Sequence, residues 1–227
     1  MNIGIIGSGR IGGNAGWLFA RAGHAVLFSF SRDPEKLAAL AAAAGAHART
    51  GTPRDAAAFG DVVMLAVPWG AIDEALAAAG PLDGTILIDT TNQFTGTGLV
   101  ALPDGISAAA YNARRARGAR LVKAYNTLTA GFQAAAAGRM GPDRVAMFYA
   151  GEDADAKGVV AGLIDDSGFA PVDLGGWAEA PIMEAPQRPG AVYGEEYHLT
   201  QAREIAAAAR TDAALAARLA QEYKVGA

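Results

Sequence analysis

Six residues near the start of the chain have the types and spacing that bind a dinucleotide. The glycine-rich turn Gly7-Ser8-Gly9-Arg10-Ile11-Gly12 follows the apolar residues 2–6. In such a turn the first glycine permits a tight bend, the second lets backbone amides approach a pyrophosphate, and the third lets a helix pack closely on the sheet. The positive end of that helix then faces the ligand's negative charge. The spacing also occurs in structural turns, but here an apolar run precedes it and an amphipathic segment, 14–22, follows, which favours a cofactor site.

The end of the next apolar run predicts which dinucleotide binds. Residues 25–30 have the pattern of a strand that ends in Ser31-Arg32, with no carboxylate before Asp33. Sites for NAD usually place Asp or Glu here to accept hydrogen bonds from the ribose 2′-hydroxyl. A carboxylate would repel a 2′-phosphate, whereas a hydroxyl and a guanidinium satisfy its oxygens, so the sequence favours NADP(H). The alternative is that Ser31 caps the helix that Asp33-Pro34 announces, while Arg32 is solvated.

Two later strand ends carry side chains that suit the nicotinamide end of a dinucleotide. Pro68-Trp69 follows the apolar run 62–67, and Asn92 follows the run 85–89. Ligands of open parallel sheets bind at this carboxyl edge. The indole of Trp69 is expected either to cover the nicotinamide or to pack on the helix that follows. Asn92 is expected either to contact the ribose or carboxamide or to brace its own loop.

A third strand end offers the two residues that we consider for catalysis. The run 121–125 contains Lys123 and delivers Asn126 to the same edge. Hydride transfer between a nicotinamide and a flavin-like ring requires close stacking and excluded water more than an acid or base, because the cofactors carry the chemistry. We therefore expect Asn126 and Lys123 to orient the carboxamide or the acceptor by hydrogen bonds, or else to be buried structural groups.

Composition excludes several other classes of protein. The 227 residues are 52% hydrophobic and 19% charged, which is typical of a folded chain, and the formal charge of -4 gives no footprint for nucleic acid. The lack of cysteine removes disulfides and thiolate sites, and the three histidines lack metal-ligand spacing, so we expect no metal. Because the first strand is expected at residue 2 and no apolar run reaches about eighteen residues, we expect a soluble cytoplasmic protein without a membrane partner.

Helices and strands are expected to alternate along most of the chain. This alternation predicts an α/β fold, a Rossmann-type doubly wound parallel sheet with a short, mainly helical C-terminal appendage. Pro171 forfeits a ladder hydrogen bond and so places the last strand at a sheet edge. The expected strands are 2–6, 25–30, 46–48, 62–67, 85–89, 121–125, 144–150 and 170–174, and the longer expected helices are 33–44, 71–79, 106–117, 129–137 and 154–167.

The pattern changes after Gly175-Gly176, which divides the chain into an NADP-binding domain, residues 1–176, and a C-terminal segment, residues 177–227. Within the segment, residues 177–184 have a helical pattern and residues 200–223 are predicted to form one alanine-rich helix. The aromatic, acidic and imidazole side chains between them line either a substrate pocket or a dimer contact. These residues are Tyr193, Glu195, Glu196, Tyr197 and His198.

Taken together, the motifs resemble the NADP oxidoreductases that depend on the deazaflavin coenzyme F-420 (F420) and their bacterial relatives. The resemblance spans residues 1–174 and rests on residues 5–12, Ser31-Arg32 with Lys36 one helical turn on, 67–69, 89–92 and 123–127. It implies that Ser31, Arg32 and Lys36 hold the 2′-phosphate of NADP(H). It also implies that the nicotinamide lies near Val67-Pro68-Trp69 and the Asn126 loop, with the backbone of Ala130 as a partner of the carboxamide. The archaeal F420 enzymes have histidine where this chain has Asn126, and the segment after Gly175 also differs.

The predicted function is therefore that of an NADP-dependent oxidoreductase that passes a hydride between NADPH and a small acceptor, such as F420 or a flavin. The resemblance also implies a homodimer. One alternative is a hydroxyacid or imine reductase with Lys123 as acid and Asn126 as orienting group, although those families append a longer helical domain than the roughly fifty residues after Gly176. A second alternative is an NADPH-binding sensor without turnover.

Overall fold

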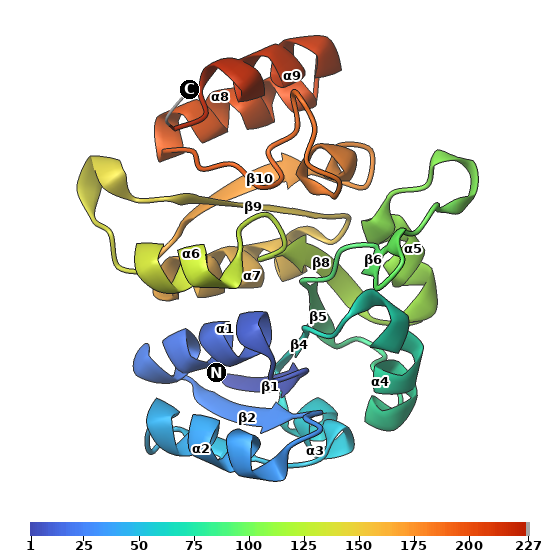
Figure 1. Cartoon of the computed structure of the whole chain (residues 1–227), viewed down its shortest axis with the longest axis vertical. Helices are drawn as coiled ribbons and strands as arrows, with labels where there is room; N and C mark the ends of the chain where they lie inside the picture. Colours follow the sequence, from blue (N-terminus) through green and yellow to red (C-terminus); the bar gives the residue numbers. More distant parts are fainter. Residues whose placement is uncertain (226–227) are drawn as a thin grey trace.

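Eight strands form one sheet in the computed structural model, which describes residues 1–225 (Figure 1). Two further short strands form a hairpin after the fifth strand, in a stretch where the sequence predicts no strand. The strands of the sheet are β1 (Asn2–Ile6), β2 (Ala25–Ser29), β3 (Ala48–Thr50), β4 (Val62–Leu65), β5 (Ile86–Asp89), β8 (Arg120–Ala124), β9 (Ala146–Gly151) and β10 (Ala170–Gly175), and those of the hairpin are β6 (Phe94–Thr95) and β7 (Gly98–Leu99). Their order in the sheet is β10-β9-β8-β5-β4-β1-β2-β3, so β10 lies at an edge, as Pro171 predicts.

The direction of the strands confirms the Rossmann prediction for most of the sheet and corrects it for the rest. All neighbours from β3 to β8 are parallel. β9 runs antiparallel to β8, with Ala124 opposite Tyr149 and Val122 opposite Gly151, and β10 is parallel to β9. The prediction of a wholly parallel sheet is therefore wrong for β9 and β10. β9 starts near the carboxyl end of β8 and runs back along it. The alternation of helices and strands does not indicate at which end of the strands a connection returns to the sheet.

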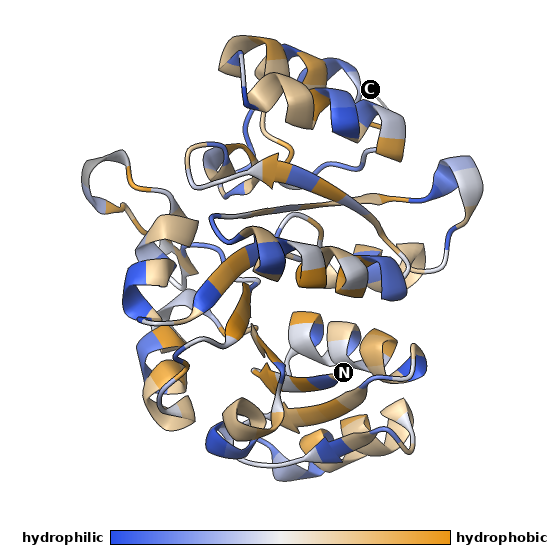
Figure 2. Cartoon of the chain, turned by 180° about the vertical axis from the view of Figure 1, so that it is seen from behind, coloured by the Kyte–Doolittle hydropathy of each residue, from blue (hydrophilic) through white to orange (hydrophobic). Residues whose placement is uncertain are grey.

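Helices cover both faces of the sheet, because each central strand presents apolar side chains on both of its faces. In β4, Val62 and Met64 join the core under α1, α2, α6 and α7, whereas Val63 and Leu65 join the core under α3, α4 and α5. Figure 2 shows mostly hydrophobic strands between helices of mixed hydropathy. The helices are α1 (Arg10–Arg21), α2 (Pro34–Ala44), α3 (Pro53–Phe59), α4 (Ile72–Ala79), α5 (Ala108–Arg115), α6 (Ala130–Ala136), α7 (Ala154–Asp166), α8 (Leu199–Ala209) and α9 (Ala213–Glu222), and the 3-10 turns are η1 (Trp69–Ala71), η2 (Pro103–Gly105), η3 (Gly141–Asp143) and η4 (Ala180–Met183).

The C-terminal segment packs on β9 and β10, at the end of the molecule opposite α2 and α3 (Figure 1). The single helix predicted over 200–223 is wrong, since α8 ends at Ala209 and α9 begins at Ala213. Asp212 causes the break, because its carboxylate caps the amides of Ala214 and Leu215, each at 3.0 Å. The helix predicted over 177–184 is reduced to η4. Within residues 1–225, no helix has the length and apolar character needed to cross a membrane.

The carboxylate of Asp153, which caps α7 between β9 and β10, makes the stability of the fold depend on pH. Its Oδ1 accepts a hydrogen bond from the amide of Ala156 at 2.9 Å, and Arg120 donates to both carboxylate oxygens at 2.6 and 2.7 Å. The Arg120 guanidinium holds the pKa of the Asp153 carboxyl well below its ordinary value of 3.8. A carboxyl with a depressed pKa stabilises the fold fully above its unfolded pKa, and this contribution is lost as the pH falls through the folded pKa.

We therefore expect Asp153→Ala to lower the Tm at neutral pH, and the difference from the unaltered protein to shrink as the pH falls below 3.8. Thermal melts followed by circular dichroism over a pH series measure both quantities. A difference in Tm that stays constant across the series would contradict the assignment.

Candidate cofactor site

The three glycines of the turn after β1 have distinct environments that match the roles expected of them. Gly7 has a φ of +102°, and a Cβ there would lie 2.4 Å from the carbonyl oxygen of Ala66. A Cβ on Gly12 would lie 2.1 Å from the carbonyl oxygen of Gly7, so only glycine lets α1 approach the turn. A Cβ on Gly9 would meet no atom within 4 Å. The turn is thus tight at both ends and open at the middle glycine.

The open glycine is also the N-cap of α1, and no side chain caps the helix. The first amides of α1, beginning with those of Arg10 and Ile11, therefore have no partner within the helix. The turn itself is fixed to β2, because the carbonyl of Ser29 accepts hydrogen bonds from the Gly7 amide at 3.1 Å and from the Ser8 hydroxyl at 2.9 Å. A fixed turn with free amides at a helix N-terminus is an arrangement that binds a pyrophosphate.

The three residues predicted to hold a 2′-phosphate, Ser31, Arg32 and Lys36, are all exposed after the end of β2. The alternative role of Ser31 as helix cap is wrong, because Asp33 caps α2 by accepting from the amides of Glu35 and Lys36. Lys36 lies 3.5 Å from the Asp33 carboxylate and its side chain is 84% exposed, whereas Arg32 forms no ion pair in the described part of the chain. A free guanidinium, a hydroxyl and an exposed ammonium at one loop fit a phosphate dianion.

At the end of β4, Val67 is buried, Pro68 is exposed, and Trp69 is buried against α5. The indole stacks on Tyr111 with ring centroids 6.0 Å apart and planes 24° apart, and the guanidinium of Arg115 lies 5.4 Å from its centroid. Of the two roles considered for Trp69, packing on a helix is the one that the structure shows, and the helix is α5 rather than α4. This stacking holds η1, which begins at Trp69, against α5.

Asn92 and Asn126 bridge the ends of β5 and β8. The Asn92 amide donates to the Asn126 carbonyl at 3.0 Å, and the Asn126 amide donates to Asn92 Oδ1 at 3.2 Å and to the carbonyl of Met183 at 2.7 Å. Asn126 is only 5% exposed, yet its Oδ1 is buried without a hydrogen-bond partner. An unpaired buried acceptor costs about 1–3 kcal/mol. The amide of a nicotinamide carboxamide is a donor that would satisfy it, so this residue fits the cofactor.

The backbone conformation of Tyr125 sets the position of Asn126 in this bridge. Tyr125 has a φ of 60°, a conformation that costs energy for an aromatic residue, and it is completely buried. Its hydroxyl lies 2.8 Å from Ser167 Oγ and donates to the carbonyl of Leu163, which holds the ring in place and lets the chain turn sharply at Asn126. Strained backbone conformations of this kind are frequent at binding sites.

Lys123 lies inside the protein rather than on the surface of the site. Its side chain and that of Asp89 are both 0% exposed, and Lys123 Nζ lies 3.1 Å from Asp89 Oδ2 and 2.7 Å from the carbonyl of Thr91. Asn112 donates to Asp89 Oδ2 and to Thr91 Oγ1, each at 2.9 Å. The network braces the loop that presents Asn92. Direct contact between the Lys123 amine and a substrate would require this loop to open.

Comparison with known proteins finds a family that the N-terminal part of the chain resembles. Residues 2–93 match the model of a family described as NADP oxidoreductase, coenzyme F420-dependent. The N-terminal part of the chain is thus similar to this family, and the matched residues include the glycine turn, the Ser31-Arg32 loop and Asn92. With the reductases among the similar structures, this likeness makes the protein an NADP-dependent oxidoreductase.

Solved structures are similar to this chain over most of its length. A hypothetical protein from Sinorhizobium meliloti is 30% identical with a TM-score of 0.75, and the match covers 88% of this chain and 96% of that one. A protein from an Arthrobacter species, assigned as an F420-dependent NADP reductase, is 27% identical with a TM-score of 0.65 over 79% of this chain and 87% of that one. A reductive aminase from Aspergillus terreus in complex with NADPH shares the fold at 23% identity and a TM-score of 0.58, with 78% of this chain and 56% of that one covered.

Several residues of this oxidoreductase lie at the site but were not among those predicted from the sequence. Buried polar atoms without partners include Asn14 Nδ2, Gln93 Oε1 and Thr127 Oγ1, besides Asn126 Oδ1. Asn14 is in α1, soon after the glycine turn, and the other two flank the predicted asparagines. A polar residue inside an otherwise apolar helix was the signal for Asn14. Ala130 begins α6, so its amide belongs to the first turn, as its predicted role as backbone partner requires.

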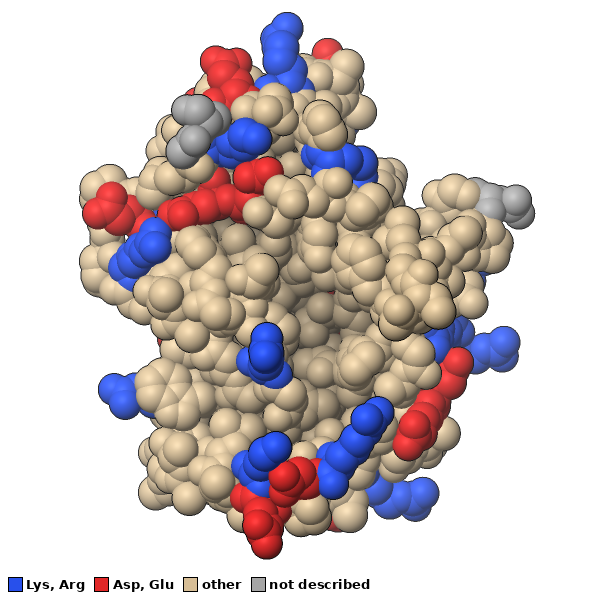
Figure 3. Space-filling model, viewed as in Figure 1, with Lys and Arg blue, Asp and Glu red and all other residues tan. Residues whose placement is uncertain are grey.

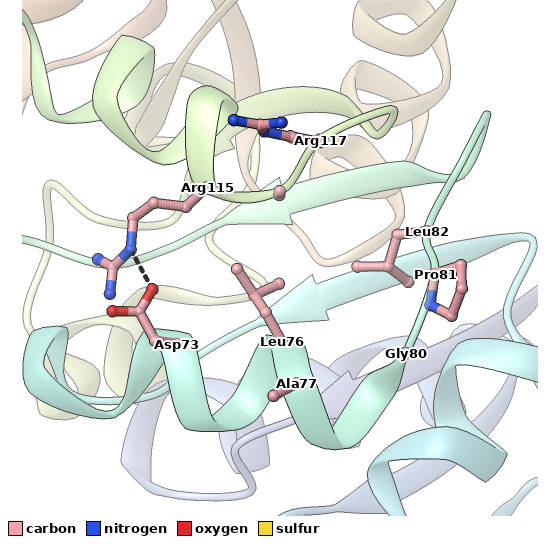
Figure 4. A pocket seen from close by; sticks show the side chains of 9 residues that line it. Asp73, Leu76, Ala77, Gly80, Pro81, Leu82, Arg115 and Arg117 are labelled. Atoms are coloured by element: carbon pink, nitrogen blue, oxygen red, sulfur yellow. Dashed lines mark hydrogen bonds and ion pairs between the residues drawn. The ribbon is translucent and has the colours of Figure 1, made fainter.

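The arginines of α5 belong to another part of the surface. A cavity of about 340 Å³ lies between α4 and the end of α5. Figure 4 shows side chains that line it, among them Leu76, Leu82 and Arg117. At its rim, Arg115 Nε donates to Asp73 Oδ1 at 2.8 Å, and this bond lowers the pKa of the Asp73 carboxyl. None of the residues predicted to bind the cofactor lines this cavity. The space-filling view instead shows a separate hollow near the middle of the molecule, in the region where β4 and β5 lie in Figure 1 (Figure 3).

Proposed function

We propose that the protein transfers a hydride between NADPH and a planar, flavin-like acceptor, in the manner of an F420 reductase. The observation that carries the proposal is the state of Lys123: this lysine, on the strand that leads to Asn126, is buried and paired with Asp89. Reduction of an imine or carbonyl needs a proton as well as a hydride, whereas transfer between two stacked rings depends mainly on position. The polar groups at this edge are amides and hydroxyls, which orient rings.

Each part of the site has a task in this proposal. The free amides at the start of α1 hold the pyrophosphate, and Ser31, Arg32 and Lys36 hold the 2′-phosphate of NADP(H), which supplies the hydride when bound. Asn126 Oδ1 accepts a hydrogen bond from the carboxamide and so fixes which face of the ring is presented. The Lys123–Asp89 pair keeps the supporting loop rigid, and buried Val67 and Trp69 exclude water from below η1.

The imine reductase alternative receives support from the fold alone. The chain covers only 56% of the length of the Aspergillus terreus reductive aminase, and 53% of that of an imine reductase from Myxococcus stipitatus. The remainder of those chains lies outside the match. The sensor alternative makes the same prediction for NADPH binding and differs only in turnover.

Turnover with a panel of acceptors tests the proposal. Purified protein is mixed with NADPH and, separately, with F420, FMN, a quinone, a ferric chelate and a cyclic imine, and loss of the nicotinamide absorbance is followed. The proposal expects oxidation with F420 or FMN and none with the imine. Turnover of the imine alone would favour the second candidate, and tight NADPH binding without turnover of any acceptor would favour a sensor.

A further inference from the structure

An aromatic pair stands beside the Asn92–Asn126 bridge and joins two distant parts of the chain. The rings of Phe94, in β6, and Tyr193, in the C-terminal segment, have centroids 6.5 Å apart and planes inclined by 39°. Phe94 is 41% exposed and Tyr193 is half-buried. The pair thus presents aromatic surface to solvent, although the protein buries most of its other large apolar side chains.

Backbone hydrogen bonds at Phe94 and beside Tyr193 hold the two residues against the loops that carry Asn92 and Asn126. The amide of Phe94 donates to the carbonyl of Asn92 at 2.7 Å, and β6 packs against η1. The amide of Gly194, next to Tyr193, donates to the carbonyl of Thr127 at 2.8 Å. Thr127 is 2% exposed, and its Oγ1 is a buried atom without a partner, like Asn126 Oδ1. The aromatic pair therefore borders the unpaired polar groups of the site.

The C-terminal segment that carries Tyr193 is held against the site of its own chain. Besides the bond from Asn126 to Met183, the buried carboxylate of Glu184 accepts from the amides of Ala108 and Ala109, each at 2.8 Å. Glu184 thereby caps α5 from 75 residues away along the chain. Two interactions stabilise such a contact between a carboxylate and a helix N-terminus: the charge-assisted hydrogen bonds and the attraction of the negative charge to the helix dipole.

We propose that Phe94 and Tyr193 form the wall that binds the planar ring of the hydride acceptor, and that segment 177–225 closes the site of its own chain. The inference rests on the proposed function and names the residues that select the acceptor. Offset or edge contacts between aromatic rings are favourable beyond the area they bury, so this wall favours a deazaflavin or flavin ring over a small aliphatic acceptor.

Binding of the acceptor to the NADP⁺-loaded protein tests the inference apart from turnover. The fluorescence of F420, or of FMN, reports the Kd of the acceptor, and a parallel titration reports the Kd of NADPH. Phe94→Ala and Tyr193→Ala are each expected to weaken acceptor binding roughly tenfold and to raise its KM, without change in the Kd of NADPH. Tyr193→Phe, which keeps the ring, is expected to retain acceptor binding.

The matched control is Tyr223→Ala, which removes the same side chain from the end of α9, where the hydroxyl contacts Glu204 at 2.8 Å. An unchanged Kd for NADPH shows in each variant that the fold persists. If the unaltered protein turns over an acceptor but neither wall variant changes its Kd or KM, the wall is wrong and the proposed function stands. If the unaltered protein binds no planar acceptor, both are overturned.

Discussion

Arg32→Asp weakens NADPH binding roughly 100-fold and leaves NADH binding within a few-fold of its original value. Charge-assisted hydrogen bonds contribute about 1.5–3 kcal/mol each, and the new carboxylate adds repulsion of the 2′-phosphate. Arg32 is exposed and forms no ion pair within residues 1–225, so its replacement breaks no ion pair of the fold. Titration of the protein with each dinucleotide, followed by nicotinamide fluorescence, measures both constants.

Arg203→Asp provides the control for net charge. Arg203 is exposed on α8, in the segment that packs on β10, and the substitution changes the charge of the protein by the same amount. It is expected to leave both dinucleotide affinities unchanged. Equal weakening of NADPH and NADH by Arg32→Asp would dismiss the assignment of the phosphate, because only NADPH carries it.

Lys123→Met destabilises the fold by about 3–5 kcal/mol, since it leaves the carboxylate of Asp89 buried without its cation. The side chains of both partners are completely buried, which makes solvent screening negligible. Urea unfolding measures the change as a lower midpoint at an unchanged slope. Addition of NADPH is expected to raise the midpoint of the variant, because ligands that bind the native state stabilise it.

Lys123→Met combined with Asp89→Asn separates the charge from the packing. The double variant buries no charge and keeps an acceptor for the Thr91 amide, which now bonds Asp89 Oδ1 at 2.9 Å, so it is expected to recover part of the lost stability. A double variant no more stable than Lys123→Met would show that the pair's electrostatics are not the cause. Retained turnover in Lys123→Met would exclude the lysine as proton donor, whereas lost turnover with intact NADPH binding would support that role.

The fold class was predictable because each central strand is a short run of apolar residues between turn signals, and because two glycines of the first turn are each required for a steric reason. Gly7 and Gly12 would clash with backbone atoms if they carried a Cβ, and sequence spacing alone announces such positions. The direction of β9 and the break between α8 and α9 were not predictable from periodicity. The first depends on where a connection re-enters the sheet, and the second on the Asp212 cap prevailing over an alanine-rich helical pattern.

By itself, the sequence determined the Rossmann-type sheet, the glycine turn and the preference for NADP(H), because these depend on residue types at short spacings. The tertiary structure alone decided that Lys123 is sealed against Asp89, that Trp69 stacks on α5, and that Tyr193 meets Phe94. These contacts join residues from 34 to 99 positions apart in the chain. Local patterns carry no information about such pairs, since burial and partnership arise only when separate strands and helices pack together.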